Sequence, residues 1–564
     1  VRTVVASVLF SCAIPNISRA DSREAFEERV HAELRAIDPE AIPLIERAEA
    51  THPQPGVLHF RAARAYLERG TVDGGTHAAE FTGVMAAIYA VSRWVSQLAE
   101  GEKSVVDWFS HRAVYVMPCI SPDGFQAMCD GAPFIRSSLR PPQPGTVRSG
   151  LDPCDIDGDG VVRWMRWKHP AGPFVPDPDV PLFMRPRTLE DDPEDAYFLC
   201  DEGEFIQWDG GKWRSAPKAF GVDLNRNFPG SWQPFEMFGM DGGAFSLSEP
   251  ESRAVVDAFS GRPFIGAGLT NHTYTGCLLT QPYAKNPPIS KADIDLMEHL
   301  AKEAVKGTDY KVFKVNPEFT YDPDKLIVGV WADSMVSVFG VPGYTLELWD
   351  PLGEAGLELE KPLEFFLKPD PEQMKKLFAH FSAEGHAVEP WRSFDHPQLG
   401  EVEIGGIDYL RTLRNPPVDK LQGECEAGFK VADALRRALP DVSGSLRTEH
   451  HGKTWSVEVT LENHGYLPTS ATLRGARLTG APKISAKLEC SEGLTIVSGP
   501  DEIELEHLEG WGQTLVGSGR NPVYASLPSH GHRTIARWMV EGSGKVTVTW
   551  CAGRAGEGRV DGHL

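Results

Sequence analysis

The stretch PFIGAGLTNHTY, residues 263–274, reads as a short buried strand that ends at a histidine. The apolar run from Phe264 to Leu269 comes first, and Thr270, Asn271 and His272 follow it. Ligands of open α/β sheets gather at the carboxyl ends of strands, which is where this pattern places His272. A single histidine in such a position is more often structural than a ligand, so its meaning depends on the rest of the chain.

Apolar runs alternate with amphipathic segments between about residues 53 and 390, which is the pattern of an α/β protein. Helices are expected to begin near Gly83 and near Ser248, and a third is expected at 290–306. Further buried strands are expected at 113–117 and 344–348. The segment Ser248-Glu249-Pro250-Glu251 has the form of a capping box, in which Ser248 would cap the following helix.

The pattern changes after about residue 440, where short runs alternate between apolar and polar residues. Such runs, separated by Gly, Pro and Asn turns, predict a β-sandwich. The predicted division is a leader and helical segment at 1–50, a catalytic domain at 51–390 with an insertion at 137–220, a connecting segment at 391–440 and a β-sandwich domain at 441–564.

The 564 residues carry a formal net charge of −23, which argues against sequence-independent binding to nucleic acid or to anionic membranes. No apolar stretch is long enough to span a membrane. The run from Val4 to Ile14, followed by Ser18 and Ala20, fits either a signal peptide or a misplaced start. Nine scattered cysteines do not identify a compartment, so localisation stays open, with a lean toward a secreted or periplasmic protein.

Four short segments, one of which is the segment with His272, combine residue types that metal and carboxylate chemistry requires. His77 and Glu80 lie three residues apart at an expected strand-to-helix turn, where both could hold one metal ion. Arg226 can grip a carboxylate with two hydrogen bonds, and Asn225 can add an amide donor. Glu347 lies in an apolar strand, where an unpaired carboxylate is costly. Each segment alone has an ordinary structural explanation, for example a helix-capping Glu80 or a solvated Arg226.

Together and in this order, the four segments resemble the zinc metallocarboxypeptidases of the carboxypeptidase A/B type. Ser121-Pro122-Asp123-Gly124-Phe125 is similar to a turn of that family, and Arg136 follows at the spacing of its oxyanion-binding arginine. Gln281-Pro282-Tyr283 is similar to the segment after the second metal-binding histidine. The acidic insertion and the C-terminal β-domain resemble a bacterial branch. The resemblance implies a mixed, mostly parallel sheet flanked by helices.

The resemblance implies one zinc ion per chain, held by His77, Glu80 and His272. Glu347 would be the general base for a zinc-activated water, and Arg136 would face the developing oxyanion. Asn225 and Arg226 would hold the terminal carboxylate of a peptide or protein, so that the C-terminal peptide bond is hydrolysed. Tyr321 is the nearest candidate for the mobile tyrosine of the family, although its spacing is stretched. The residues that would choose the C-terminal side chain cannot be assigned.

The insertion contains Asp155, Asp157 and Asp159 at alternate positions, as at the start of a calcium loop. The twelfth position of that loop is Arg166 instead of Glu, so the alternatives are a partial calcium site and a solvated acidic turn. Two other functions stay open. One is a zinc amidase or deacylase that acts on a small or cell-wall-derived amide, and the other is a catalytically inactive binding member.

Overall fold

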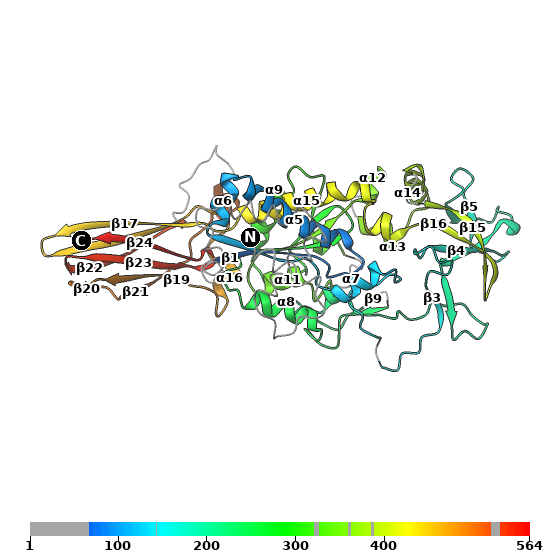
Figure 1. The fold of residues 1–564 in the computed structure, drawn as a ribbon, viewed down its shortest axis with the longest axis horizontal. Helices are drawn as coiled ribbons and strands as arrows, with labels where there is room; N and C mark the ends of the chain where they lie inside the picture. The colour runs from blue at the N-terminus through cyan, green and yellow to red at the C-terminus, as the bar shows by residue number, and fades with distance from the viewer. Residues whose placement is uncertain are drawn as a thin grey trace.

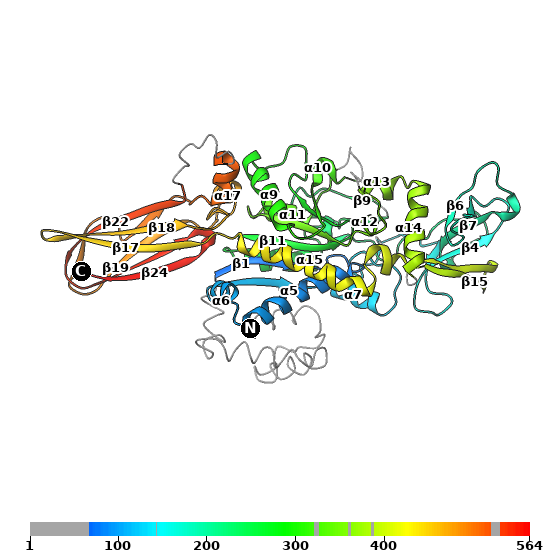
Figure 2. The same cartoon turned by 90° about the horizontal axis from the view of Figure 1, so that it is seen from above.

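A computed structural model describes residues 67–142, 144–237, 239–320, 326–358, 362–384, 388–519 and 531–564. The expected leader and helical segment at 1–50 and the candidate Tyr321 lie outside these ranges. Figures 1 and 2 show three parts in a row: a β-sandwich at one end, a sheet covered by helices in the middle, and a second sheet at the other end. No helix among the described residues has the length and apolar character needed to cross a bilayer.

The middle part is built on a six-stranded sheet of order β13-β12-β14-β11-β1-β2. Its strands are β1 (Leu67–Asp73), β2 (Arg112–Met117), β11 (Ala267–Thr273), β12 (Cys277–Thr280), β13 (Lys311–Lys314) and β14 (Gly343–Leu348). All neighbours run parallel except β12 and β14, which are antiparallel. The predicted α/β class with a mixed, mostly parallel sheet is therefore confirmed.

Helices cover both faces of this sheet. The helices in chain order are α5 (Phe81–Ala99), α6 (Lys103–Phe109), α7 (Pro122–Cys129), α8 (Pro250–Ser260), α9 (Lys291–Ala304), α10 (Val315–Glu318), α11 (Trp331–Ser337), α12 (Pro351–Glu354), α13 (Pro362–Leu367), α14 (Pro371–Glu384) and α15 (Val418–Arg437). α5, α9 and α15 share one apolar core with Leu269 and Leu346 of the sheet. α11 packs on the opposite face, where Gly268 has no side chain to obstruct Met335.

Two expectations for local structure are wrong. The strand expected at 264–269 is β11 at Ala267–Thr273, so it starts later and contains His272. The capping box does not form, because α8 has Glu249 as its N-cap and no side-chain cap. Instead, the Ser248 hydroxyl donates to Glu249 Oε1 at 2.5 Å, and the Glu249 amide donates to Asn227 Oδ1 at 3.1 Å.

The insertion and the connecting segment together form the second six-stranded sheet, of order β15-β16-β4-β7-β5-β6. Its strands are β4 (Trp164–Lys168), β5 (Phe174–Pro176), β6 (Met184–Pro186), β7 (Tyr197–Asp201), β15 (Val388–His396) and β16 (Gly400–Ile407). β4 pairs with β16 so that Arg166 lies opposite Glu403, and the two side chains form an ion pair. The short pairs β3 (Gly150–Pro153) with β8 (Gly203–Ile206) and β9 (Glu236–Met237) with β10 (Met240–Asp241) complete this region.

The C-terminal part consists of two four-stranded sheets, β17-β18-β22-β20 and β21-β19-β23-β24, around one core. The strands are β17 (Val442–His451), β18 (Thr454–Asn463), β19 (Ile484–Cys490), β20 (Leu494–Ser498), β21 (Glu502–Leu505), β22 (Arg533–Gly542), β23 (Lys545–Ala552) and β24 (Glu557–His563), and the short helices are α16 (Leu473–Arg477) and α17 (Trp511–Thr514). Val457, Val459 and Leu461 of β18 and Val546 and Val548 of β23 are buried in that core. The alternating pattern in the sequence thus correctly predicted a sandwich.

Arg554 joins the sandwich to the middle part. Its guanidinium is buried and donates to the carbonyl oxygens of Pro263, Ile265 and Phe339, at 2.9, 2.5 and 2.7 Å. Burial lowers the pKa of Arg554 to about 10, which leaves it cationic at neutral pH. The first two carbonyls lie just before β11, so this contact holds the chain where it enters the central strand.

Arg554→Met should therefore destabilise the protein by about 2–4 kcal/mol, because three buried carbonyl groups lose a charged donor. Urea unfolding followed by tryptophan fluorescence would measure the change. Arg559→Met is the matched control, since Arg559 is exposed and pairs with Asp561 at the surface, and it should change stability little. Equal effects of the two substitutions would contradict the role of Arg554.

Candidate functional site

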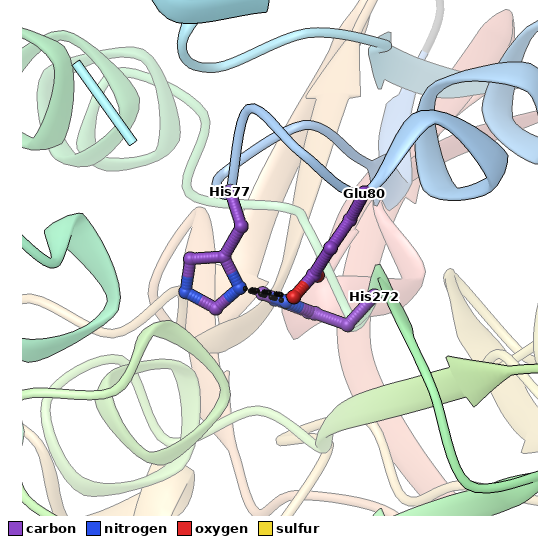
Figure 3. Close-up of side chains that lie close together, drawn as sticks. All are labelled: His77, Glu80 and His272. Carbon is purple, nitrogen blue, oxygen red and sulfur yellow. Dashed lines mark hydrogen bonds and ion pairs between the residues drawn. The ribbon is translucent and has the colours of Figure 1, made fainter. Parts of the chain in front are cut away.

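His77, Glu80 and His272 come together at the carboxyl end of the central sheet. His77 and Glu80 lie in the turn between β1 and α5, where Gly75 has a φ of +61° that suits glycine, and His272 lies in β11. All three side chains are at least 95% buried. Figure 3 shows both imidazoles turned toward the carboxylate of Glu80.

The facing atoms form a compact set of metal donors. His77 Nδ1 and His272 Nδ1 are 3.0 Å apart, and the Glu80 carboxylate lies 2.9 Å from each of them. Two ligands at ordinary zinc distances in a tetrahedral site are separated by about 3.3 Å, so the set suits a small divalent ion. Two imidazoles and one carboxylate leave a coordination position for water or substrate.

Asp223 contacts both His77 and Arg136 beside this cluster. Its Oδ1 lies 3.2 Å from His77 Nε2. When His77 carries its proton on Nε2 and donates it to Asp223, the lone pair of Nδ1 points toward the cluster. Asp223 Oδ2 accepts from Arg136 Nε at 3.1 Å. Burial would raise the pKa of Asp223, but Arg136, Arg226 and His77 outweigh it and hold that pKa well below its usual range. The sequence did not reveal the role of Asp223, although an acidic residue two positions before Asn225 was an available signal.

The predicted substrate residues lie around the same cluster. Arg136 Nη1 is 3.3 Å from Glu80 Oε1. Asn225 Nδ2 lies 3.5 Å from His272 Nε2, while its Oδ1 accepts from the Trp331 amide. Arg226 is buried, donates to the carbonyl of Asn225 and lies over the ring of Phe235. Two cations and one amide thus adjoin the metal donors.

Glu347 lies directly opposite His272 in the pairing of β14 with β11. Its side chain is partly buried and faces the cleft. Burial raises the pKa of Glu347 to about 7, His272 opposes the rise, and Glu80 adds to it. A carboxyl group with a pKa near neutrality can both accept and donate a proton at physiological pH.

Arg414 is a functional candidate that the sequence did not reveal. It ends the π-helical turn Tyr409–Arg414 of the connecting segment, and its Nη1 is 3.2 Å from both Glu80 Oε1 and the Thr273 carbonyl. The rings of Phe134, Tyr274 and Tyr409 surround its guanidinium. No motif around residue 414 distinguishes it, because its position depends on a fold contact between distant segments.

A cleft of about 940 Å³ connects these groups. The metal donors His77 and Glu80, together with Glu347, line it at one side, and residues of the insertion and the connecting segment line the rest. The cleft is therefore large enough for several residues of an extended peptide.

The three aspartates of the insertion also lie together, with one carboxylate oxygen of each within 4.8 Å of the others. Arg392 pairs with Asp157 and Asp159, and Arg163 pairs with Asp159. Asp155 accepts hydrogen bonds from the amides of Gly158 and Gly160. Arg166 does not reach this turn, because it belongs to β4 and pairs with Glu403.

Two known protein families match parts of the chain. Residues 61–153 and 197–375 match the family described as zinc carboxypeptidase, and residues 444–561 match a family described as a domain of unknown function. No curated protein matches the chain.

Several solved structures are similar to the chain at low identity. Thrombin activatable fibrinolysis inhibitor is 18% identical, with 57% of this chain and 62% of that chain covered and a TM-score of 0.31. Its bovine form, in complex with tick carboxypeptidase inhibitor, is 17% identical, with 56% and 81% covered and a TM-score of 0.29. Carboxypeptidase A from Helicoverpa armigera is 13% identical, with 68% and 78% covered and a TM-score of 0.32. The chain thus spans less than two thirds of the first of these proteins.

The raised pKa of Glu347 makes the stability of the metal-free protein depend on pH. The carboxyl titrates near pH 7 when folded and near 4.5 when unfolded, so the folded state loses up to about 3 kcal/mol as the pH rises through this interval. Glu347→Gln removes the loss of stability that accompanies ionisation of this carboxyl group. In urea unfolding of the chelator-treated protein, the variant should be more stable than the unsubstituted protein at pH 8 but not at pH 4.

Glu492→Gln is the control, because Glu492 is exposed in a turn of the sandwich and should show no such difference. A Glu347→Gln variant whose advantage is the same at both pH values would contradict the raised pKa.

Proposed function

We propose that the protein is a zinc-dependent carboxypeptidase that hydrolyses the C-terminal bond of peptides or proteins, because residues 61–153 and 197–375 match the zinc carboxypeptidase family. The observation that carries the proposal is the buried set of two imidazole nitrogens and one carboxylate, with Glu347 beside it. His77, Glu80 and His272 would hold the metal. Zinc, when bound there, supplies a Lewis acid that polarises a carbonyl group and lowers the pKa of water.

Each side chain around the metal donors would have a separate role in hydrolysis. Glu347 would take the proton of the attacking water and pass it to the leaving amine. Arg136 would stabilise the negative charge that develops on the carbonyl oxygen. Arg226 and the Nδ2 group of Asn225 would hold the terminal carboxylate, so that only the last peptide bond reaches the metal donors.

A mixed peptide library analysed by mass spectrometry tests this function. The zinc-loaded protein should remove one C-terminal residue from many peptides, and zinc analysis should find about one ion per chain. Glu347→Gln should retain that zinc but lose about 10²–10⁴-fold in turnover, since the proton acceptor is gone.

The matched control is Glu364→Gln, a substitution of a carboxylate outside the metal cluster, which should keep turnover. Cleavage of N-acyl amino acids or muropeptides alone would support the amidase alternative instead. Zinc binding without any hydrolysis would support an inactive binding member, and absence of zinc would remove the metalloenzyme proposal.

Calcium binding by Asp155, Asp157 and Asp159 stays a prediction. The proximity of the three carboxylates supports it, whereas Arg163 and Arg392 compete with a cation for Asp157 and Asp159. Calorimetry with calcium chloride at low ionic strength should detect a dissociation constant of about 10⁻⁴–10⁻³ M. Asp157→Asn should abolish the signal, and Asp209→Asn, at an exposed acid elsewhere in the insertion, should not. The absence of any heat from the unsubstituted protein would identify a solvated turn.

A further inference from the structure

His77 and His272 present the same ring nitrogen to the candidate metal site. Their Nδ1 atoms lie 3.0 Å apart, and each is 2.9 Å from the Glu80 carboxylate. Nδ1 can bind a metal ion only through its lone pair, so the proton of the neutral imidazole has to be on Nε2. For His77, Asp223 Oδ1 lies 3.2 Å from Nε2 and can accept the hydrogen bond from that N–H. His272 is fully buried and needs an acceptor of its own.

The contacts of His272 Nε2 identify that acceptor. Among the residues that the structure describes, Nε2 has hydrogen-bond contacts with Thr270 Oγ1 at 3.2 Å and with Asn225 Nδ2 at 3.5 Å. The amide group of Asn225 is oriented by its Oδ1, which accepts from the Trp331 amide at 3.0 Å. Nδ2 of Asn225 is therefore a donor and cannot receive the His272 proton. The acceptor available to His272 is the hydroxyl group of Thr270.

The sheet explains why the Thr270 hydroxyl is available to His272. The two residues are two positions apart in β11, so their side chains lie on the same face. The register pairs Thr270 with Asp73 at the end of β1. Burial raises the pKa of Asp73 to about 7, while the Thr270 hydroxyl, His272 and the Trp331 indole limit that rise. An ionised Asp73 attracts the hydroxyl proton of Thr270 and leaves a lone pair of Oγ1 for His272.

We propose that Thr270 is a positioning residue of the metal site, whose hydroxyl accepts a hydrogen bond from His272 Nε2 and keeps the Nδ1 lone pair directed at the metal. This inference rests on the proposed zinc-dependent function. Thr270 would act only through His272, since it does not line the cleft. The same tautomer leaves the Nδ2 group of Asn225 for the terminal carboxylate of a substrate, because a protonated Nε2 cannot accept a hydrogen bond from it.

The zinc affinity of the full chain tests this role without relying on hydrolysis. Competition with a chromophoric chelator at pH 8, above the pKa of Asp73, gives the dissociation constant. Thr270→Val should raise this constant by about 10–100-fold, because the buried His272 N–H loses its acceptor while the shape of the side chain is kept. Thr270→Ala also removes the hydroxyl and should weaken binding, and it supplies the comparison where the valine variant does not fold. Thr270→Ser keeps the hydroxyl and should keep the affinity.

Visible absorption of the cobalt(II)-loaded proteins gives a second readout, because the spectrum depends on the geometry of the ligands. The spectrum should change in the valine and alanine variants but not in the serine variant. Urea unfolding of the chelator-treated proteins shows which variants are folded.

Thr345→Val is the matched control. Thr345 is buried, pairs with Thr270 in the register of β14 with β11, and contacts the Tyr283 hydroxyl instead of a histidine. This substitution should leave the zinc affinity unchanged. Zinc binding by Thr270→Val that equals that of the unsubstituted protein, or an equal loss in Thr270→Ser or Thr345→Val, would overturn the role of Thr270 while the zinc-dependent function stands. An unsubstituted protein that binds no zinc would reject the function and the positioning role together.

Discussion

The buried carboxylate of Glu80 is the group on which the arrangement of the site depends. One oxygen faces His77, Arg136 and Arg414, and the other faces His272 and the Thr273 amide. Burial would raise the pKa of Glu80, but the two histidines hold it well below its usual range. An ionised carboxylate in the interior needs such partners. Because they come from the β1–α5 turn, β11, the segment after α7 and the connecting segment, a single charge joins four distant parts of the chain.

The register of the sheet determines which residues can meet this carboxylate. β1, β11 and β14 are parallel neighbours, so their carboxyl ends lie at one edge. Asp73, His272 and Glu347 occupy that edge, and Trp331 links it to the loop that carries Asn225. The indole of Trp331 donates to Asp73 Oδ2, and its amide donates to Asn225 Oδ1, both at 3.0 Å. Trp331 thereby holds both Asp73 and the Asn225 side chain, whose amide lies beside His272.

The sequence was most informative where the chemistry lies within a few residues. The turn with His77 and Glu80, the Asn225-Arg226 pair and Glu347 each belong to a short motif, and their order along the chain carried the resemblance. Local periodicity predicted the α/β class, whereas the mixed, mostly parallel sheet followed from the resemblance. Features that depend on distant partners were not predictable. The pairing of Arg166 with Glu403 joins strands more than 200 residues apart, and the Arg554 contact accompanies the later start of β11. At the start of α8, the Asn227 side chain likewise accepts a hydrogen bond from the Glu249 amide, and the Ser248 hydroxyl donates to the Glu249 side chain.

The charge of the whole protein and the cations inside the cleft would have opposite effects on an anionic peptide. A protein of net charge −23 repels an anionic peptide at a distance, and salt weakens that repulsion because the charges are exposed. Within the cleft, low accessibility reduces the screening, so Arg136, Arg226 and Arg414 would act strongly on an anion bound at close range. The insertion and the connecting segment contribute to this effect, since they wall off the cleft and bring Lys218 and Arg414 into it. Selection of an anionic chain end would therefore depend on contacts inside the cleft and not on the field of the whole protein.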